Sequence, residues 1–180
     1  MEHLYFIRHG QSVANSEKII ADAFSPLTPT GISQAAETAV LLKPLNIALI
    51  FSSPLLRARQ TAETVADVIG LDKSKITVID DLRERGLGEL ENKPKTQESR
   101  WYFDTSEGYG IETHEELYER MKKALNEIRV LSKITSNILI SGHSISGDML
   151  RLITDNKSDF SRLADYELTK NAGYFELNVK

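Results

Sequence analysis

Close to its start the chain reads Leu4-Tyr5-Phe6-Ile7-Arg8-His9-Gly10, in which four apolar residues run directly into two basic residues and a glycine. A short apolar run that stops at such residues is typical of a buried strand. Runs of the same kind recur at residues 48–51, 76–79, 138–141 and 174–179. The pattern therefore predicts five strands.

Longer amphipathic stretches separate these runs and predict helices at residues 31–42, 55–69, 113–131 and 146–153. In the third of them Leu117, Met121 and Leu125 recur at helical spacing and form one buried face. Strands that alternate with helices predict an α/β three-layer sandwich, in which helices cover both faces of a mostly parallel central sheet. Because no helix of sufficient length leads into the last strand, we expect that strand at an edge and antiparallel.

The composition fits a single domain spanning residues 1–180, because 41% of the residues are hydrophobic and 27% are charged. A net charge of −4 without a long basic stretch argues against a nucleic-acid surface.

The apolar runs are far shorter than the roughly 20 residues of a membrane span. The start shows no signal-peptide pattern, so we expect a cytoplasmic protein. The absence of cysteine excludes disulfides, thiolate nucleophiles and cysteine-based metal sites.

Residues suited to chemistry follow the predicted strands at their carboxyl ends, where open α/β sheets bind ligands. In chain order they are Arg8 and His9, then Arg57, then the segment Asp80-Asp81-Leu82-Arg83-Glu84-Arg85 with its carboxylates, and His143. Guanidinium groups bind phosphate oxygens, an imidazole can carry a covalent intermediate, and a carboxylic acid can protonate a leaving oxygen. The set therefore favours phosphoryl chemistry that requires neither a metal nor another cofactor.

Several motifs, spread in order over most of the chain, carry a family resemblance. They are Phe6-Ile7-Arg8-His9-Gly10-Gln11-Ser12 with Asn15, Pro26-Leu27-Thr28-Pro29-Thr30-Gly31, Ser52-Ser53-Pro54-Leu55-Leu56-Arg57-Ala58, Leu82-Arg83-Glu84, and Ser141-Gly142-His143. Together these motifs resemble the histidine phosphatase superfamily. The resemblance implies the phosphoglycerate-mutase-like fold, which is an α/β sandwich.

The resemblance also implies a role for each motif residue. His9 is implied to be the nucleophile that becomes phosphohistidine, and Glu84 the acid for the leaving group and the base for water. The implied phosphate pocket consists of Arg8, Asn15, Arg57, His143 and Ser144. Attack requires a neutral His9, and the neighbouring guanidinium charges favour that form.

Four functions are compatible with these residues. The first is a phosphatase for phosphomonoesters of small metabolites, and the second is phosphoglycerate mutase-type transfer to another oxygen of the substrate. Mutases of this family typically carry a larger insertion after the acid residue. Here only 27 residues (85–111) separate Glu84 from Glu112, which favours hydrolysis.

The third function is a protein phosphohistidine phosphatase, and the fourth is a catalytically silent domain that binds phosphorylated ligands. The irregular segment 86–110 gives the site more cover than the third role needs, so a small-molecule ester is preferred as the partner. The intact set of catalytic residue types argues against the fourth. No pattern predicts the oligomeric state.

The remaining polar and aromatic residues have structural interpretations. Thr113 and Glu116 have the spacing of a capping box at a helix start. His3 and His114 lie outside the motifs, and we interpret them as structural or solvated. The aromatic residues 101–103 either pack beneath segment 86–110 or border the substrate. Ser144 and Asn92 stand where the family usually carries glycine.

Overall fold

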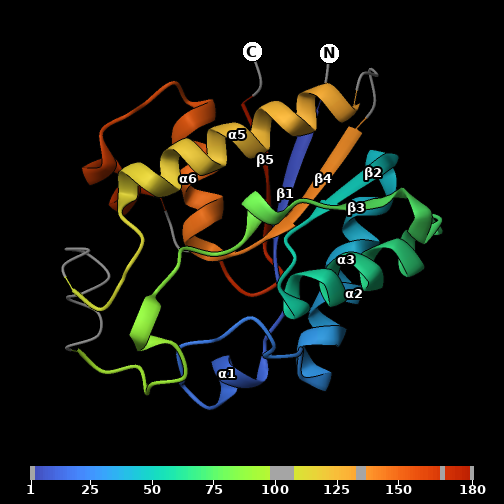
Figure 1. Cartoon of the computed structure of the whole chain (residues 1–180). Helices are drawn as coiled ribbons and strands as arrows, with labels where there is room; N and C mark the ends of the chain where they lie inside the picture. The colour runs from blue at the N-terminus through green and yellow to red at the C-terminus, as the bar shows by residue number, and fades with distance from the viewer. Residues whose placement is uncertain (1–2, 98–107, 133–136, 167–168, 179–180) are drawn as a thin grey trace.

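A five-stranded sheet forms the centre of the computed structural model, which describes residues 3–97, 108–132, 137–166 and 169–178 (Figure 1). Its strands are β1 (Leu4–Arg8), β2 (Ile47–Ser52), β3 (Ile76–Val78), β4 (Asn137–Gly142) and β5 (Tyr174–Leu177). Their order across the sheet is β3-β2-β4-β1-β5. All neighbouring pairs are parallel except β1 and β5. The expected antiparallel edge strand is therefore confirmed.

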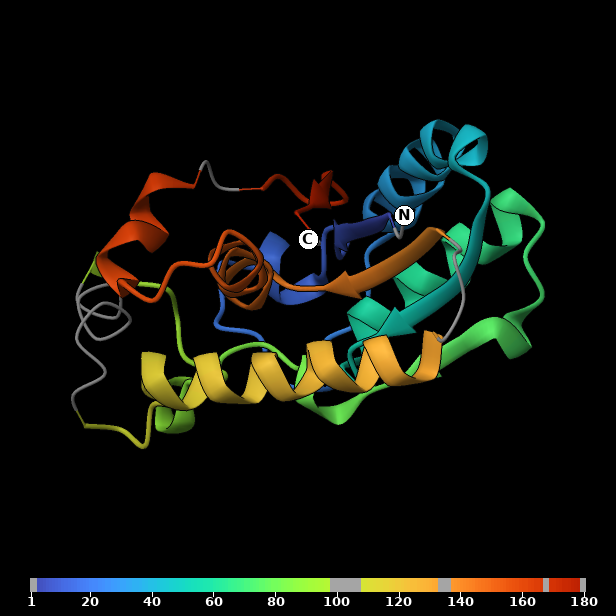
Figure 2. The same cartoon turned by 90° about the horizontal axis from the view of Figure 1, so that it is seen from above.

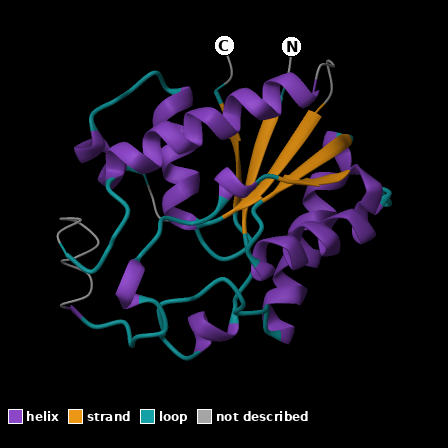
Figure 3. Cartoon of the chain, in the orientation of Figure 1, coloured by secondary structure: helices purple, strands orange, loops and turns teal. Residues whose placement is uncertain are grey.

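Helices cover both faces of this sheet (Figures 2 and 3). The α-helices are α1 (Val13–Ser16), α2 (Pro29–Leu42), α3 (Leu56–Ile69), α5 (His114–Ser132) and α6 (Ser144–Thr154). Short 3-10 helices are η1 (Lys43–Leu45), η2 (Lys73–Lys75), η3 (Asp80–Leu82), η4 (Gly88–Leu90) and η5 (Phe160–Asp165). The predicted α/β sandwich is thus confirmed. None of the helices described is both long and apolar enough to cross a membrane.

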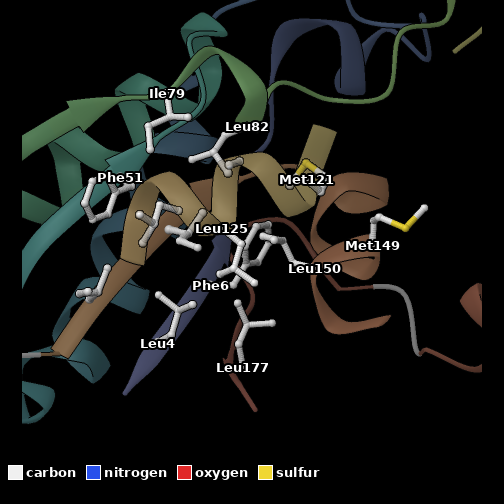
Figure 4. Close-up of a cluster of buried hydrophobic side chains, with 14 of the residues drawn as sticks. Leu4, Phe6, Phe51, Ile79, Leu82, Met121, Leu125, Met149, Leu150 and Leu177 are labelled. Atoms are coloured by element: carbon white, nitrogen blue, oxygen red, sulfur yellow. The ribbon is translucent and has the colours of Figure 1, made fainter. Parts of the chain in front are cut away.

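Strand β1 shows how the sheet separates two hydrophobic cores. Leu4 and Phe6 face the core under α5 and α6, whereas Tyr5 and Ile7 face the core under α2 and α3. Figure 4 shows the first core, in which side chains from the sheet meet those from α5 and α6. Because alternate residues of a strand point to opposite faces, a strand that is apolar throughout is buried on both. This burial fixes the carboxyl end of β1, where Arg8 and His9 follow.

Two glycines allow the loop after β1 to touch the start of α2. A Cβ atom on Gly10 would lie 2.2 Å from the carbonyl oxygen of Gly31, and one on Gly31 would lie 2.0 Å from that of Gln11. No side chain fits at either position. The hydroxyl of Thr28 accepts the Gly31 N–H and so caps α2. The two backbones therefore meet directly, next to the site.

Residues 86–97 lie across the carboxyl edge of the sheet and pair with the segment after α1. Ile20 N–H donates to Lys93 O (2.9 Å), and Lys95 N–H donates to Lys18 O (2.8 Å). Asn92 has a positive φ of 63°, a conformation that glycine and asparagine tolerate best. This agrees with the expectation that a glycine is usual there. The aromatic residues 101–103 lie outside the described part of the chain.

Candidate active site

His9 follows β1, and the backbone holds its ring in one protonation pattern. The Nδ1 atom lies 2.7 Å from the carbonyl oxygen of Gly10. A carbonyl oxygen only accepts hydrogen bonds, so Nδ1 carries the proton and the lone pair of the neutral ring lies on Nε2. The backbone N–H of His9 donates to Gly142 O (2.9 Å). This bond ties the ends of β1 and β4 together.

A second imidazole, that of His143, lies against the first. The two ring centroids are 5.2 Å apart, and the ring planes are inclined by 60°. Nε2 of His143 lies 2.7 Å from Ser53 Oγ, and its Nδ1 has no hydrogen-bond partner among the described residues. Burial, followed by the charge of Arg57, lowers the pKa of both histidines well below the ordinary value. Both rings are therefore neutral at physiological pH.

Two guanidinium groups approach the histidines from different elements. Arg8 ends β1, and its Nη1 donates to Thr169 O (2.5 Å). Arg57 lies in the first turn of α3, and its Nη1 donates to Asp22 O (2.6 Å). Burial lowers the pKa of both groups, although arginine stays charged at neutral pH. These two hydrogen bonds go to carbonyl oxygens, and Glu84 is the carboxylate that acts most strongly on both guanidinium charges.

Backbone N–H groups hold the carboxylate of Glu84 at the start of α6. Oε1 accepts from Ser146 N (2.9 Å) and Arg85 N (3.0 Å), and Oε2 accepts from Ile145 N (3.2 Å). The first N–H groups of a helix have no partner within the helix and carry partial positive charge. His143 occupies the N-cap position without a side-chain cap bond. Glu84, from a distant segment, therefore supplies the cap and is placed beside the histidines.

An ion pair fixes the loop that carries Glu84. Nε and Nη2 of Arg120 contact the two carboxylate oxygens of Glu112 at 2.7 and 2.6 Å. Nη1 of Arg120 also donates to the carbonyl oxygens of Asp81 (2.6 Å) and Arg83 (3.0 Å). Both members of the pair are buried, with side chains 8% and 13% exposed. One guanidinium from α5 thus joins the loop to the helix.

These groups surround a cavity of about 350 Å³. Six of the seven residues predicted for the site line it, namely Arg8, His9, Asn15, Arg57, Glu84 and Ser144. His143 is fully buried beside His9 and is not among the residues that line the cavity. Asn15 Oδ1 accepts from Ser12 N (3.2 Å) and Asn171 Nδ2 (3.3 Å), which fixes its position. Within the described ranges, no group of three or more His, Asp or Glu side chains could hold a metal ion.

Sequence reasoning did not assign three further cations to the cavity. Arg83, Arg85 and Lys95 also line it. Burial, followed by the charges of Arg8 and Arg57, lowers the pKa of Lys95. Lys95 reaches the cavity because a bridge between Ile19 and Pro94 brings its segment there. Such pairing between distant segments leaves no periodic signal in the sequence.

Thr113 and Glu116 form the predicted capping box. Thr113 N–H donates to Glu116 Oε2 (2.9 Å), and Glu116 N–H donates to Thr113 Oγ1 (3.1 Å). His3 and His114 lie outside the cavity, as expected: His3 pairs with Glu176, and His114 contacts Arg85. His114 therefore lies one contact away from the cavity, through Arg85.

Proteins of known structure share the fold over nearly the whole chain. YhfR from Bacillus stearothermophilus superimposes with a TM-score of 0.85 at 22% identity and covers 100% of this chain and 92% of its own. A mycobacterial glucosyl-3-phosphoglycerate phosphatase superimposes with a TM-score of 0.83 at 21% identity. The match covers 98% of this chain and 90% of the phosphatase. The alpha-ribazole phosphatase from Shigella flexneri superimposes with a TM-score of 0.83 at 20% identity, and the match covers 99% of this chain and 91% of that phosphatase. At these identities the likeness establishes the fold alone.

Sequence comparison establishes the family. A protein named probable phosphoglycerate mutase GpmB from Yersinia pestis (strain Pestoides F) is 34% identical over 163 residues, which cover 83% of this chain and 74% of the relative. A protein of the same name from Yersinia pseudotuberculosis serotype O:1b is also 34% identical over 163 residues. The family model of the histidine phosphatase superfamily (branch 1) matches residues 4–179. The chain belongs to this superfamily, as its motifs suggested.

Proposed function

We propose that the chain is a phosphatase that hydrolyses phosphomonoesters of small metabolites through a phosphohistidine on His9, with Glu84 as general acid and base. One observation carries the proposal: the Nε2 lone pair of a neutral His9 lies in a cavity that Arg8 and Arg57 make positive. Fixed positive charge binds an anionic ester, and a neutral ring keeps its nucleophilic lone pair. The arrangement therefore suits attack on a phosphate ester.

In the first step, Nε2 of His9 forms a bond to phosphorus while the bond from phosphorus to the ester oxygen breaks. The departing oxygen takes a proton from Glu84, so an alcohol leaves and Glu84 becomes a carboxylate. Glu84 must carry a proton when this step begins. Arg8 and Arg57 stabilise the charge on the transferring phosphoryl oxygens.

In the second step, water attacks the phosphorus of the phosphohistidine. Glu84 removes a proton from the water, the bond from phosphorus to Nε2 breaks, and inorganic phosphate leaves. The amides of Ile145 and Ser146 suit this alternation, because they bind the carboxylate that forms after each proton donation. His9 returns to its neutral form.

His143 is proposed as a neutral hydrogen-bond donor to the phosphoryl group. Ser53 Oγ already accepts the N–H of Leu55 (3.2 Å), which leaves its own O–H to donate to Nε2 of His143. The proton of the neutral ring then lies on Nδ1, the ring nitrogen without a partner in the described residues. Asn15 and Ser144 are proposed to complete the phosphate contacts. Since arginine and histidine supply the charge and the donors, we propose that no metal is required.

The decisive experiment measures phosphate release from an aryl phosphate in the presence of a metal chelator. Native protein should turn over, and His9→Ala should lose roughly 10⁴-fold or more of the rate. His3→Ala is the matched control, because this histidine is half exposed and lies outside the cavity. Acid-labile, base-stable labelling of native protein by a radioactive ester would identify phosphohistidine. Unchanged turnover in His9→Ala would refute the mechanism.

Glu84→Gln tests the proton transfer separately. The rate on an alkyl phosphate should fall by about 10²–10⁴-fold. An aryl phosphate, whose leaving oxygen needs little protonation, should be affected much less in its first step. Equal losses on both esters would contradict the role of Glu84 as the acid.

Phosphoglycerate mutase-type transfer is the second candidate, because the two Yersinia relatives carry that name. A mutase would interconvert monophosphoglycerates after priming by a bisphosphate and release little free phosphate. The compact connection from Glu84 to Glu112 favours hydrolysis. Measuring the isomer and the phosphate in one assay separates the two functions.

A further inference from the structure

A buried carboxyl group, that of Asp148, lies behind the anion site. Helix α6 packs directly on β1: a Cβ atom on Gly147 would lie 2.6 Å from ring atoms of Phe6. This close packing places Asp148, the next residue, in the interior beside the end of β1, where it is 7% exposed. The reaction proposed above assigns no task to this group.

Within the described part of the chain, one oxygen of the Asp148 carboxyl group lacks a hydrogen-bond donor. Its nearest cation is Arg151, with Nη1 at 3.7 Å from Oδ1, which is too long for a hydrogen bond. The guanidinium of Arg151 lies instead over the ring of Phe175, 3.4 Å from its centroid. Oδ1 is buried and accepts no hydrogen bond within the described residues. Ionisation of such a group is costly.

Three charged groups face Asp148 from the elements packed around it. They are Arg151 on α6, Arg8 at the end of β1 and Glu84 in the loop after η3. Burial raises the pKa of Asp148 to about 7, and Glu84 acts in the same direction, whereas Arg151 and Arg8 oppose the rise. The charge of Asp148 in turn stabilises the protonated form of Arg8. The carboxyl group and the guanidinium are thus coupled.

We propose that Asp148 is a positioning residue that sets the effective charge of Arg8 and so controls how strongly the cavity binds a dianion. The proposal rests on the anion-binding role proposed for Arg8. With Asp148 neutral, the positive charge of Arg8 is available to the ligand. With Asp148 ionised, that charge is partly compensated from behind and the ligand binds more weakly. By linkage, binding of a dianion must draw a proton onto Asp148.

Sulfate binding, measured by calorimetry between pH 6 and 8.5, tests the proposal. Sulfate remains a dianion throughout this range, so the ligand itself contributes no transition. We expect the dissociation constant of native protein to rise at least roughly fivefold across a transition near neutral pH. Asp148→Asn should remove the transition and bind sulfate at pH 8.5 as tightly as native protein does at pH 6.

Two further variants separate this role from a merely structural one. Glu37→Gln on α2 removes an exposed carboxylate far from the cavity, and the transition should remain unchanged. Arg151→Gln removes a charge that favours ionised Asp148, so the transition should move to higher pH. Binding that is independent of pH in native protein, or a transition that survives in Asp148→Asn, overturns the proposal. Absence of sulfate binding at every pH would instead overturn the anion site itself and, with it, the proposed function.

Discussion

Replacing Arg120 by methionine removes the guanidinium that joins the Glu84 loop to α5. The native side chain makes two short contacts with the carboxylate of Glu112 and further bonds to loop carbonyl oxygens. Methionine fills much of the same volume but offers no donor. Because its side chain is only 13% exposed, Glu112 would keep a charge with restricted access to water and without its cationic partner. The change therefore isolates the cost of breaking a buried ion pair.

The expected loss follows from that burial. Breaking a buried ion pair by removing one partner costs about 3–5 kcal/mol. Loop carbonyl oxygens that lose a charged donor can add to this cost, although such terms are not additive. Since small domains are stable by about 5–15 kcal/mol, the Arg120→Met variant should fold but be markedly less stable. The matched control is Lys122→Met on the same helix, whose exposed pair with Glu119 should contribute about 1 kcal/mol or less.

The pH dependence has a definite sign. Burial alone would raise the pKa of Glu112, but the bonds from Arg120 and the Gly86 N–H outweigh it and leave that pKa below the ordinary value. A carboxyl group with a depressed folded-state pKa contributes stability above its unfolded pKa and loses it as the pH falls through the folded one. The cost of Arg120→Met should therefore be largest at neutral pH and shrink in acid, where Glu112 becomes protonated and its charge disappears.

Urea unfolding followed by circular dichroism provides the assay, for native protein, Arg120→Met and Lys122→Met at neutral and acidic pH. The difference in midpoint multiplied by the slope gives the change in unfolding free energy. A loss below about 1 kcal/mol at neutral pH would refute the buried-pair reasoning. A loss that is equally large in acid would show that packing, not charge, is the cause.

Three further changes test other parts of the structure. Lys95→Met should raise the KM for a phosphoester about tenfold through loss of one charge-assisted contact, with kcat little changed. Steady-state kinetics at two salt concentrations measures both parameters. An unchanged KM would place Lys95 outside the binding site. Gly31→Ala should destabilise the protein by about 1–3 kcal/mol or more, because its Cβ would meet the backbone of Gln11; thermal unfolding measures this. Thr113→Ala should cost about 0.5–2 kcal/mol by removing the cap of α5, and an unchanged melting temperature would contradict that role.

The sequence predicts the sheet because its strands are continuous apolar runs that end at polar residues. The predicted segments 48–51 and 138–141 each extend by one residue at either end in β2 (Ile47–Ser52) and β4 (Asn137–Gly142). The edge position of β5 follows from the lack of a crossover helix. The short helix α1 has no such signal, since four residues cannot show a helical period.

The site residues likewise fall into those that the sequence pattern could place and those that it could not. Arg8, His9, Arg57 and Glu84 could be placed together because parallel strands bring their carboxyl ends to one edge. Lys95 and Asp148 could not be placed. Lys95 arrives through a bridge between irregular segments, and Asp148 resembles any other polar residue of an amphipathic helix until its burial is known. The missing information is long-range contact, which periodicity does not carry.

Two functions of the cavity depend on the same charges. In the proposed reaction Arg57 and Arg8 attract the anionic ester, and their charges, after burial, also lower the pKa of His9. Protonation of His9 would remove the nucleophile, and it would do so most readily if the guanidinium groups were absent. Binding and nucleophilicity are thus coupled through electrostatics: an anion that neutralises the arginines also makes His9 easier to protonate. Burial and the charges of Arg57 and Arg8 keep the pKa of His9 low, whereas the bond to the Gly10 carbonyl oxygen acts in the opposite direction. That bond fixes the proton on Nδ1 and leaves the lone pair on Nε2.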